Sequence, residues 1–149
     1  MFDRAKLIAE LKIEEGVRFV VYDDGTGKVI VPGTHVVGNP TVGIGHALNL
    51  NPFTAEETTT ICGWDIDKKT PEIYATWPWL ANLSVPRQDA IADLAFNMGV
   101  AKLKLFVTFL AMLEAGNCAG AAADLAATLW AQEVGPDRSS RIEGLIRNG

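Results

Sequence analysis

The fold is decided by residues 15–46, which read EGVRFVVYDDGTGKVIVPGTHVVGNPTVGIGH. Residues 17–22 are rich in β-branched and aromatic side chains and predict a strand. Residues 23–27 have the composition of a turn, and residues 28–31 predict a second strand. Residues 41–45 predict a short extended piece that leads to a histidine. The stretch therefore predicts a small β-hairpin region in a chain that is otherwise helical.

Residues 3–15, which precede the hairpin, predict an amphipathic helix that Gly16 ends in a left-handed turn. Glu15 follows Ile8 of the apolar face by seven positions, so it faces inward better than Glu14 does. The negative end of the helix dipole favours the protonated form of a carboxyl group, which a general acid needs. Glu15 is therefore a candidate proton donor, and a solvated glutamate at a helix end is the alternative.

A second carboxylate, Asp24, lies nine positions after Glu15, and Thr41 begins a glycine-punctuated segment. Cleavage of a glycosidic bond usually needs one carboxylic acid to protonate the leaving oxygen and a second, ionised group to assist attack on the sugar. The pattern is compatible with that chemistry. Ordinary turn chemistry accounts for Asp24 equally well from its position alone.

The remainder of the chain, from residue 52 onward, has helical patterns. Thr54 and Glu57 fit a capping box that begins a helix reaching to about Lys69. An aromatic and proline-containing segment, Trp77-Pro78-Trp79, interrupts the pattern. Further helices are predicted over residues 84–99, 103–113, 119–130 and 138–146.

These elements predict an α+β fold that is mostly helical and forms a single domain over residues 1–149. We expect a small β-hairpin lobe at about residues 12–52 and a larger helical lobe at about residues 53–149. The helix over residues 3–15 joins them, and a cleft separates them.

Composition excludes several classes of protein. The apolar share of 48% argues against disorder, and the net charge of −5 disfavours nucleic acid as a partner. No apolar run reaches the roughly eighteen residues of a membrane span, and we expect neither membrane insertion nor a signal peptide. Cys62 and Cys118 are expected to be reduced, partly buried thiols. We expect no metal and no other cofactor, because the cysteines and His35 have no ligand spacing with His46.

Several short motifs occur in a recognisable order along nearly the whole chain. They are Glu15-Gly16, Tyr22-Asp23-Asp24, residues 41–46, Phe96-Asn97-Met98-Gly99, Phe106, residues 121–125, Trp130, Arg138 and Arg141. Each motif is weak alone, but their joint order resembles phage-type lysozymes, the muramidase endolysins of glycoside hydrolase family 24. The resemblance implies a lysozyme-like fold and hydrolysis of the β-1,4 bond between N-acetylmuramic acid and N-acetylglucosamine in peptidoglycan.

The resemblance also implies roles for individual residues. Glu15 is expected to be the proton donor, Asp24 the second catalytic carboxylate, and Thr41 the residue that positions water for an inverting reaction. An inverting site places its two carboxyl groups about 6.5 to 9.5 Å apart so that water fits between them. Matched family positions imply sugar contacts at Ala47, Phe96, Asn97 and Asp124. They also imply structural support of the site by His46 paired with Asp65, and by Arg138 paired with Glu15.

The chain departs from the family pattern in three respects. An insertion at residues 29–40 lengthens the connection between Asp24 and Thr41, which leaves open whether Thr26 or Thr41 approaches the water. Phe109 occupies a position where some relatives carry a polar side chain that faces substrate. The chain is acidic where many lysozymes are basic, so we expect weak steering toward an anionic wall.

Two alternative functions stay open from the sequence: a lytic transglycosylase, and a peptidoglycan-binding domain without catalysis. The endolysin resemblance implies peptidoglycan as partner, a monomer, and a holin as functional partner by analogy. It further implies residence in a host cytoplasm until release to the periplasm or cell wall.

Overall fold

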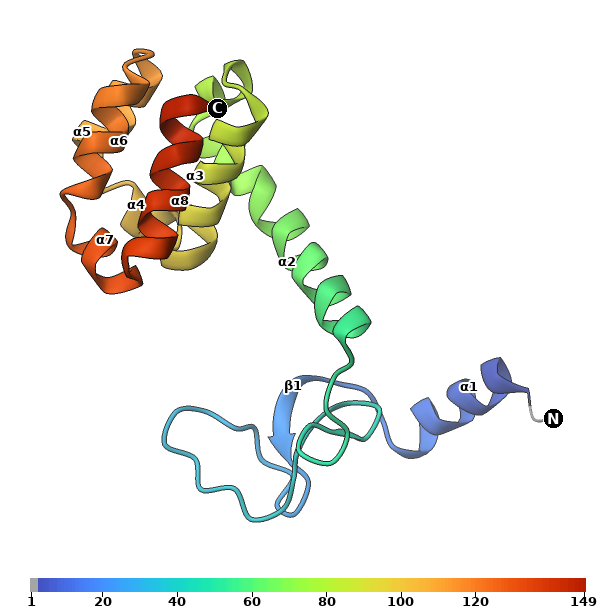
Figure 1. Ribbon diagram of the computed structural model, residues 1–149. Coiled ribbons are helices and arrows are strands. Elements are labelled where there is room, and N and C mark those ends of the chain that lie inside the picture. Colours follow the sequence, from blue (N-terminus) through green and yellow to red (C-terminus); the bar gives the residue numbers. More distant parts are fainter. Residues whose placement is uncertain (1–2) are drawn as a thin grey trace. The chain divides into compact units, whose positions relative to one another are not determined.

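A computed structural model describes residues 3–149 and confirms the predicted α+β, mostly helical fold class (Figure 1). Its strands are β1 (Arg18–Asp23), β2 (Pro40–Gly43) and β3 (His46–Ala47). Its helices are α1 (Arg4–Glu14), α2 (Ala55–Thr76), the 3-10 helix η1 (Pro78–Asn82), α3 (Val85–Met98), α4 (Val100–Leu103), α5 (Val107–Glu114), α6 (Cys118–Ala126), α7 (Leu129–Val134) and α8 (Pro136–Asn148). None of the helices in this described part combines the length and apolar composition that crossing a membrane requires.

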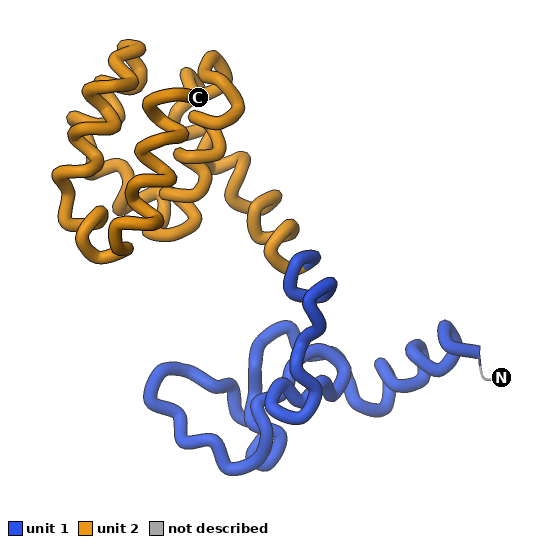
Figure 2. Tube along the Cα trace, in the orientation of Figure 1, with its two compact units in different colours: residues 1–60 blue, residues 61–149 orange. Residues whose placement is uncertain are grey.

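The chain divides into two compact units, Met1–Thr60 and Ile61–Gly149, with the boundary inside α2 (Figure 2). The first unit holds α1, the strands and the start of α2, and the second holds the remaining helices. The predicted lobe limits at residues 12–52 and 53–149, and the cleft between the lobes, stay predictions.

In the first unit, α1 begins and ends close to where the sequence indicates. Asp3 caps it by accepting a hydrogen bond from the Lys6 backbone N–H at 3.1 Å, and Glu15 is its C-terminal cap. Gly16 then has φ of 71°, a left-handed conformation that glycine adopts at little cost. This turn directs the chain from the helix into β1, so Glu15 stands at the edge of the sheet region.

The sheet has the order β1–β2–β3 with antiparallel pairing throughout. Tyr22 pairs with Thr41, and Thr41 pairs with Ala47 on its other side. The second strand predicted at residues 28–31 is wrong, because only one isolated bridge forms, between Tyr22 and Val29. A turn explains the loss of pairing: the Val31 N–H donates to the Thr34 hydroxyl at 2.9 Å, and the Thr34 N–H donates back to the Val31 carbonyl.

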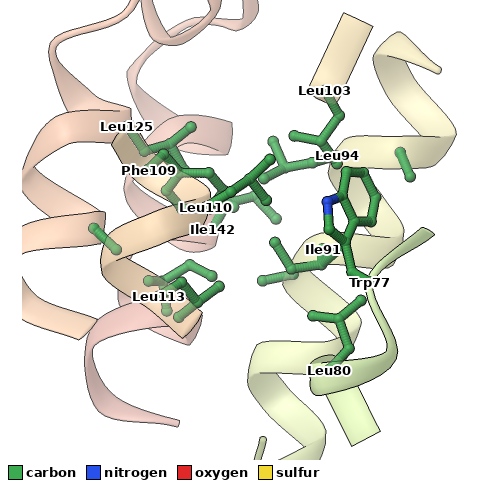
Figure 3. Close-up of a cluster of buried hydrophobic side chains, with 14 of the residues drawn as sticks. Trp77, Leu80, Ile91, Leu94, Leu103, Phe109, Leu110, Leu113, Leu125 and Ile142 are labelled. Carbon is green, nitrogen blue, oxygen red and sulfur yellow. The ribbon is translucent and has the colours of Figure 1, made fainter. Parts of the chain in front are cut away.

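The second unit has one hydrophobic core, built mainly by α3, α5, α6 and α8 (Figure 3). Its fully buried members include Ile91, Leu94, Phe109, Leu125 and Ile142. At about 25 cal/mol per Å² of apolar surface removed from water, such side chains provide the main driving force for folding. The core fixes the helix ends that carry the second unit's candidate site residues.

Three predicted helices have different limits in the structure. The helix expected to end near Lys69 continues to Thr76 through Pro71, since burial of Ile73 offsets the cost of an interior proline. The helix predicted at residues 103–113 is divided into α4 and α5, so that α4 packs on α3 while α5 packs on α6. The helix predicted at residues 119–130 is divided at Thr128.

The division at Thr128 has an identifiable local cause. The Thr128 hydroxyl accepts a hydrogen bond from the Ala131 N–H at 3.4 Å, so Thr128 is the N-cap of α7. It also donates to the Leu125 carbonyl at 2.7 Å, which satisfies the end of α6. A single threonine thus ends one helix and begins the next, and this turn chemistry outweighs the alanine-rich helix propensity around it.

Candidate active site

Glu15 follows the last turn of α1 and is exposed to solvent. Its carboxylate lies against the turn between β2 and β3, since a Cβ built on Gly45 stands 3.9 Å from Glu15 Oε2. Gly45 has φ of 70° and carries no side chain, so the turn leaves space in front of this carboxylate.

Asp24 follows β1 and is held by a residue of the insertion. Its two carboxylate oxygens accept hydrogen bonds from Asn39, one from the backbone N–H at 2.6 Å and one from the side-chain Nδ2 at 3.0 Å. These donors, led by the backbone N–H, lower the pKa of Asp24 because they favour its charged form. Asp24 is therefore an ionised carboxylate with a fixed orientation.

Thr41 lies in β2 and is 2% exposed. Its hydroxyl donates to the Asn39 carbonyl at 3.1 Å, which leaves the oxygen lone pairs available to accept a hydrogen bond. Thr26, the alternative, is committed elsewhere, because its hydroxyl donates to Asp23 Oδ2 at 2.9 Å inside the turn. The hydrogen bonds thus connect Thr41, rather than Thr26, with Asp24.

Asp23 is a buried carboxylate beside the candidate site, 1% exposed. It accepts hydrogen bonds from the Gly25 N–H and the Thr26 hydroxyl in its own turn, and from the Val37 and Gly38 N–H groups of the insertion, all at 2.8 to 3.0 Å. The donors, led by the Val37 N–H, lower the pKa of Asp23 to about 2 despite the opposing effect of burial. Asp23 therefore joins the turn to the insertion.

The support residues His46 and Asp65 belong to different units, so each is described in its own surroundings. His46 stacks on Phe53 with ring centroids 5.2 Å apart, and within residues 3–60 its buried Nε2 atom has no hydrogen-bond partner. Asp65 forms an exposed ion pair with Lys68 at 3.8 Å. The pairing of His46 with Asp65 stays a prediction.

Arg138 lies in α8 and forms a half-buried ion pair with Asp93 of α3. One guanidinium nitrogen, Nη2, contacts Asp93 Oδ1 at 2.5 Å, and Arg141 contacts the other carboxylate oxygen at 3.3 Å. Asp93, Phe96 and Arg138 line a pocket of about 330 Å³ in the second unit. The pairing of Arg138 with Glu15, which the resemblance implies, stays a prediction.

The four candidate sugar contacts differ in how much surface they offer. Ala47 is buried in β3 at 8% exposure, whereas Phe96 is 45% exposed. The Asn97 Oδ1 atom accepts from the Trp130 indole N–H at 2.9 Å, which leaves the Asn97 side-chain NH₂ group free to donate outward. Asp124 borders a separate hollow of about 230 Å³ with a mixed polar and apolar lining. Phe96, Asn97 and Asp124 therefore offer surface to a ligand.

Several aromatic side chains pack in the core rather than at the surface. Phe109 is 0% exposed and belongs to the core, so its side chain does not offer surface to a ligand. Trp77 and Trp130 are buried as well, and Trp79 packs against the same core. Both cysteines are free thiols, but Cys62 is exposed rather than partly buried.

Sequence reasoning missed the residue that connects the candidate catalytic groups, Asn39. Asparagine before proline is a common turn signal, and that reading concealed its role. Its partner Asp24 lies fifteen positions earlier, and helical or strand periodicity gives no indication of a contact at that separation. The insertion, whose role the sequence left open, supplies this residue.

Comparison with known proteins identifies the family of the chain. The sequence profile described as phage lysozyme matches residues 12–148, a range that contains Glu15, Asp24 and Thr41. A curated relative from Dictyostelium discoideum, named "Probable T4-type lysozyme 1", is 26% identical over 158 aligned residues, which cover 93% of this chain and 92% of the relative. Because the profile covers most of the chain, the protein belongs to the phage lysozyme family, a membership that supports a peptidoglycan-hydrolysing lysozyme.

Proposed function

We propose that the chain is a muramidase that hydrolyses the β-1,4 bond between N-acetylmuramic acid and N-acetylglucosamine with inversion at the sugar carbon. Glu15 protonates the leaving oxygen, Asp24 accepts a proton from the attacking water, and Thr41 orients that water. The observation that carries the proposal is the hydrogen-bonded path from the Asp24 carboxylate through Asn39 to the Thr41 hydroxyl. A base and a water-orienting group that act together need such a fixed relationship.

The two carboxyl groups have different surroundings. Asp24 receives two donated hydrogen bonds, which favour the ionised form that a base must have. Glu15 stands at the C-terminal end of α1 and is exposed to solvent. Its carboxylate lies against Gly45, which carries no side chain that would cover it.

The decisive test replaces Glu15 by glutamine and compares it with Glu14→Gln, a change of the same kind at the neighbouring position. We expect Glu15→Gln to lose about a hundredfold or more of its activity on purified peptidoglycan, the usual contribution of a general acid. Glu14→Gln should retain wild-type activity. Equal clearing of peptidoglycan by wild type and Glu15→Gln would exclude Glu15 as the acid, whereas binding of peptidoglycan without clearing by either protein would favour a binding domain without catalysis.

A lytic transglycosylase also uses an acidic residue but forms a 1,6-anhydro product without water. The ionised, oriented Asp24 favours hydrolysis, since only the hydrolytic route needs a base for water. Mass spectrometry of the released muropeptides separates the two reactions. Reducing ends carrying the added water support the muramidase, whereas anhydro ends would refute it.

The biological role included in this proposal is that of an endolysin acting as a monomer. It stays in the host cytoplasm until a holin opens the inner membrane, and then lyses the wall. Membership of the phage lysozyme family is the support for this role. Expression in bacteria without a holin should leave the cells intact, and chemical permeabilisation of the inner membrane should then lyse them. Lysis without permeabilisation would contradict the holin requirement.

A further inference from the structure

We propose that Asn39, supplied by the insertion at residues 29–40, is a positioning residue that holds the Asp24 carboxylate and the Thr41 hydroxyl in one arrangement. The set Asp24, Asn39 and Thr41 is called the Asn39 bridge below. The inference rests on the proposed function, because it gives a role in the same reaction to a residue that does not itself touch the reacting atoms.

All the polar atoms of Asn39 form hydrogen bonds, and all of them except Oδ1 bond within the bridge. Its backbone N–H and side-chain Nδ2 donate to the two oxygens of Asp24. Its carbonyl accepts from the Asp24 N–H at 3.0 Å and from the Thr41 hydroxyl at 3.1 Å. Its Oδ1 accepts from the side chain of Asn49 at 2.8 Å, which fixes the orientation of the amide. The side chain therefore has one orientation in which every bond is made.

The segment that carries Asn39 is itself hydrogen-bonded to the turn after β1. Asp23 accepts from the N–H groups of Val37 and Gly38, the two residues immediately before Asn39. The backbones of Gly25 and Gly38 approach so closely that a Cβ on Gly38 would stand 2.4 Å from the Gly25 nitrogen. Only glycine fits there, so the close approach is built into the sequence.

The bridge has a chemical consequence for the carboxylate. Two donors fix the plane of Asp24 and favour its charged form, and loss of one donor should weaken both effects. The neighbouring negative charge of Asp23 acts in the opposite direction and raises the pKa of Asp24. The other titratable side chains on or against the two segments that the bridge connects are Lys28, His35 and Arg18, whose guanidinium donates to the Gly27 carbonyl at 2.7 Å. Asn39 therefore offsets the repulsion that Asp23 introduces.

The test compares Asn39→Ala with Asn51→Ala in the full chain acting on purified peptidoglycan. Asn51 is the matched control, an exposed asparagine of the same unit whose bond to the Ala47 carbonyl comes from its backbone N–H. We expect Asn39→Ala to lower kcat about tenfold or more, the effect of losing a hydrogen bond to a charged group, with KM nearly unchanged. In the pH dependence of kcat, the fall in activity on the acid side should occur at higher pH in Asn39→Ala than in wild type. Asn51→Ala should change neither kcat nor its pH dependence.

A direct titration separates the bridge from the proposed function. The Asp24 carboxyl carbon, followed by ¹³C NMR, should titrate at higher pH in Asn39→Ala than in wild type, whether or not the protein is active. An unchanged titration together with an unchanged kcat would overturn the role of Asn39. If Glu15→Gln kept full activity while the Asp24 titration moved, the bridge would stand and the muramidase proposal would fail.

A second substitution covers the case in which Asn39→Ala does not fold. Asn39→Asp keeps the shape of the side chain but replaces the Nδ2 donor by an oxygen and adds a negative charge beside Asp24. We expect it to move the acid-side fall in kcat and the Asp24 titration to higher pH, further than the alanine variant where both can be compared. An Asn39→Asp protein with the wild-type titration would contradict the proposal.

Discussion

The carboxylate of Asp23 accepts a 2.8 Å hydrogen bond from the backbone N–H of Gly38, fifteen positions later in the chain. This bond and its companion from Val37 close a long surface connection over the end of β1. Long loops cost conformational entropy when they are fixed, and hydrogen bonds to a buried charge offset part of that cost. The fixed connection is what brings Asn39 to Asp24.

The buried Asp23 predicts how stability depends on acid. Its folded-state pKa of about 2 lies below the ordinary value of 3.8, so ionised Asp23 stabilises the folded protein above about pH 4. That contribution is lost as the pH falls from about 4 toward 2. Urea unfolding of wild type and Asp23→Asn across this range should show a difference in the free energy of unfolding that shrinks with acid. A difference independent of pH would contradict the assignment.

Replacing Gly38 by alanine should cause a steric clash that the same substitution at a helical glycine does not cause. A Cβ at Gly38 would stand 2.1 Å from Asp24 Oδ1, so Gly38→Ala must displace the backbone or the carboxylate. We expect it to lower the free energy of unfolding by about 1 to 3 kcal/mol and to lower activity. Gly144 lies in α8 with nothing within 4 Å of the place that a Cβ would take, and Gly144→Ala should stabilise by about 0.5 to 1 kcal/mol. Thermal unfolding measures the stability of the two variants. Equal effects of Gly38→Ala and Gly144→Ala would contradict the close approach of Gly38 to Asp24.

Truncation of Phe109 should lower stability without changing substrate preference. Its side chain is fully buried in the core, so Phe109→Ala should lower the free energy of unfolding by about 3 to 5 kcal/mol. The exposed Phe96 is the contrast, and Phe96→Ala should cost little stability but raise KM if it contacts sugar. Urea unfolding and steady-state kinetics measure the two quantities. A KM effect at Phe109 without destabilisation would show that it faces substrate.

The capping box at the start of α2 predicts a cost for removing Thr54. Its hydroxyl accepts from the Glu57 N–H at 3.2 Å, and Glu57 in return accepts from the Thr54 N–H at 2.8 Å. Thr54→Ala should therefore lower the free energy of unfolding by about 1 kcal/mol. Thr59→Ala, inside the same helix, should be neutral or slightly stabilising because alanine has the higher helix propensity. Equal stability of the two variants would argue against the cap.

Local signals predicted much of the fold. The left-handed Gly16, the capping box of Thr54 and the apolar spacing of α3 each depend on neighbours in sequence, and the structure confirms them. The divisions before α5 and α7 depend on which partner helix each piece packs against, or on one threonine in an alanine-rich run. Helical periodicity alone does not reveal such breaks.

The candidate site was accessible to sequence reasoning only in part. Glu15, Asp24 and Thr41 are marked by motif order, but their hydrogen-bond partners are not. Asn39 and Asp23 act across fifteen positions through backbone N–H groups, and any sequence supplies such donors equally. Phe109 is the reverse case, because its position matches a substrate-facing one in some relatives, whereas the structure buries it in the core.

The dipeptide Asn39-Pro40 has a consequence for how the protein ages. Spontaneous deamidation of asparagine begins when the nitrogen of the following residue attacks the side-chain amide, and a proline nitrogen carries no hydrogen to release. Deamidation at residue 39 would otherwise put a new anion against Asp24, since the two side chains are hydrogen-bonded. The proline therefore protects the amide that is hydrogen-bonded to Asp24, and activity should outlast deamidation elsewhere in the chain.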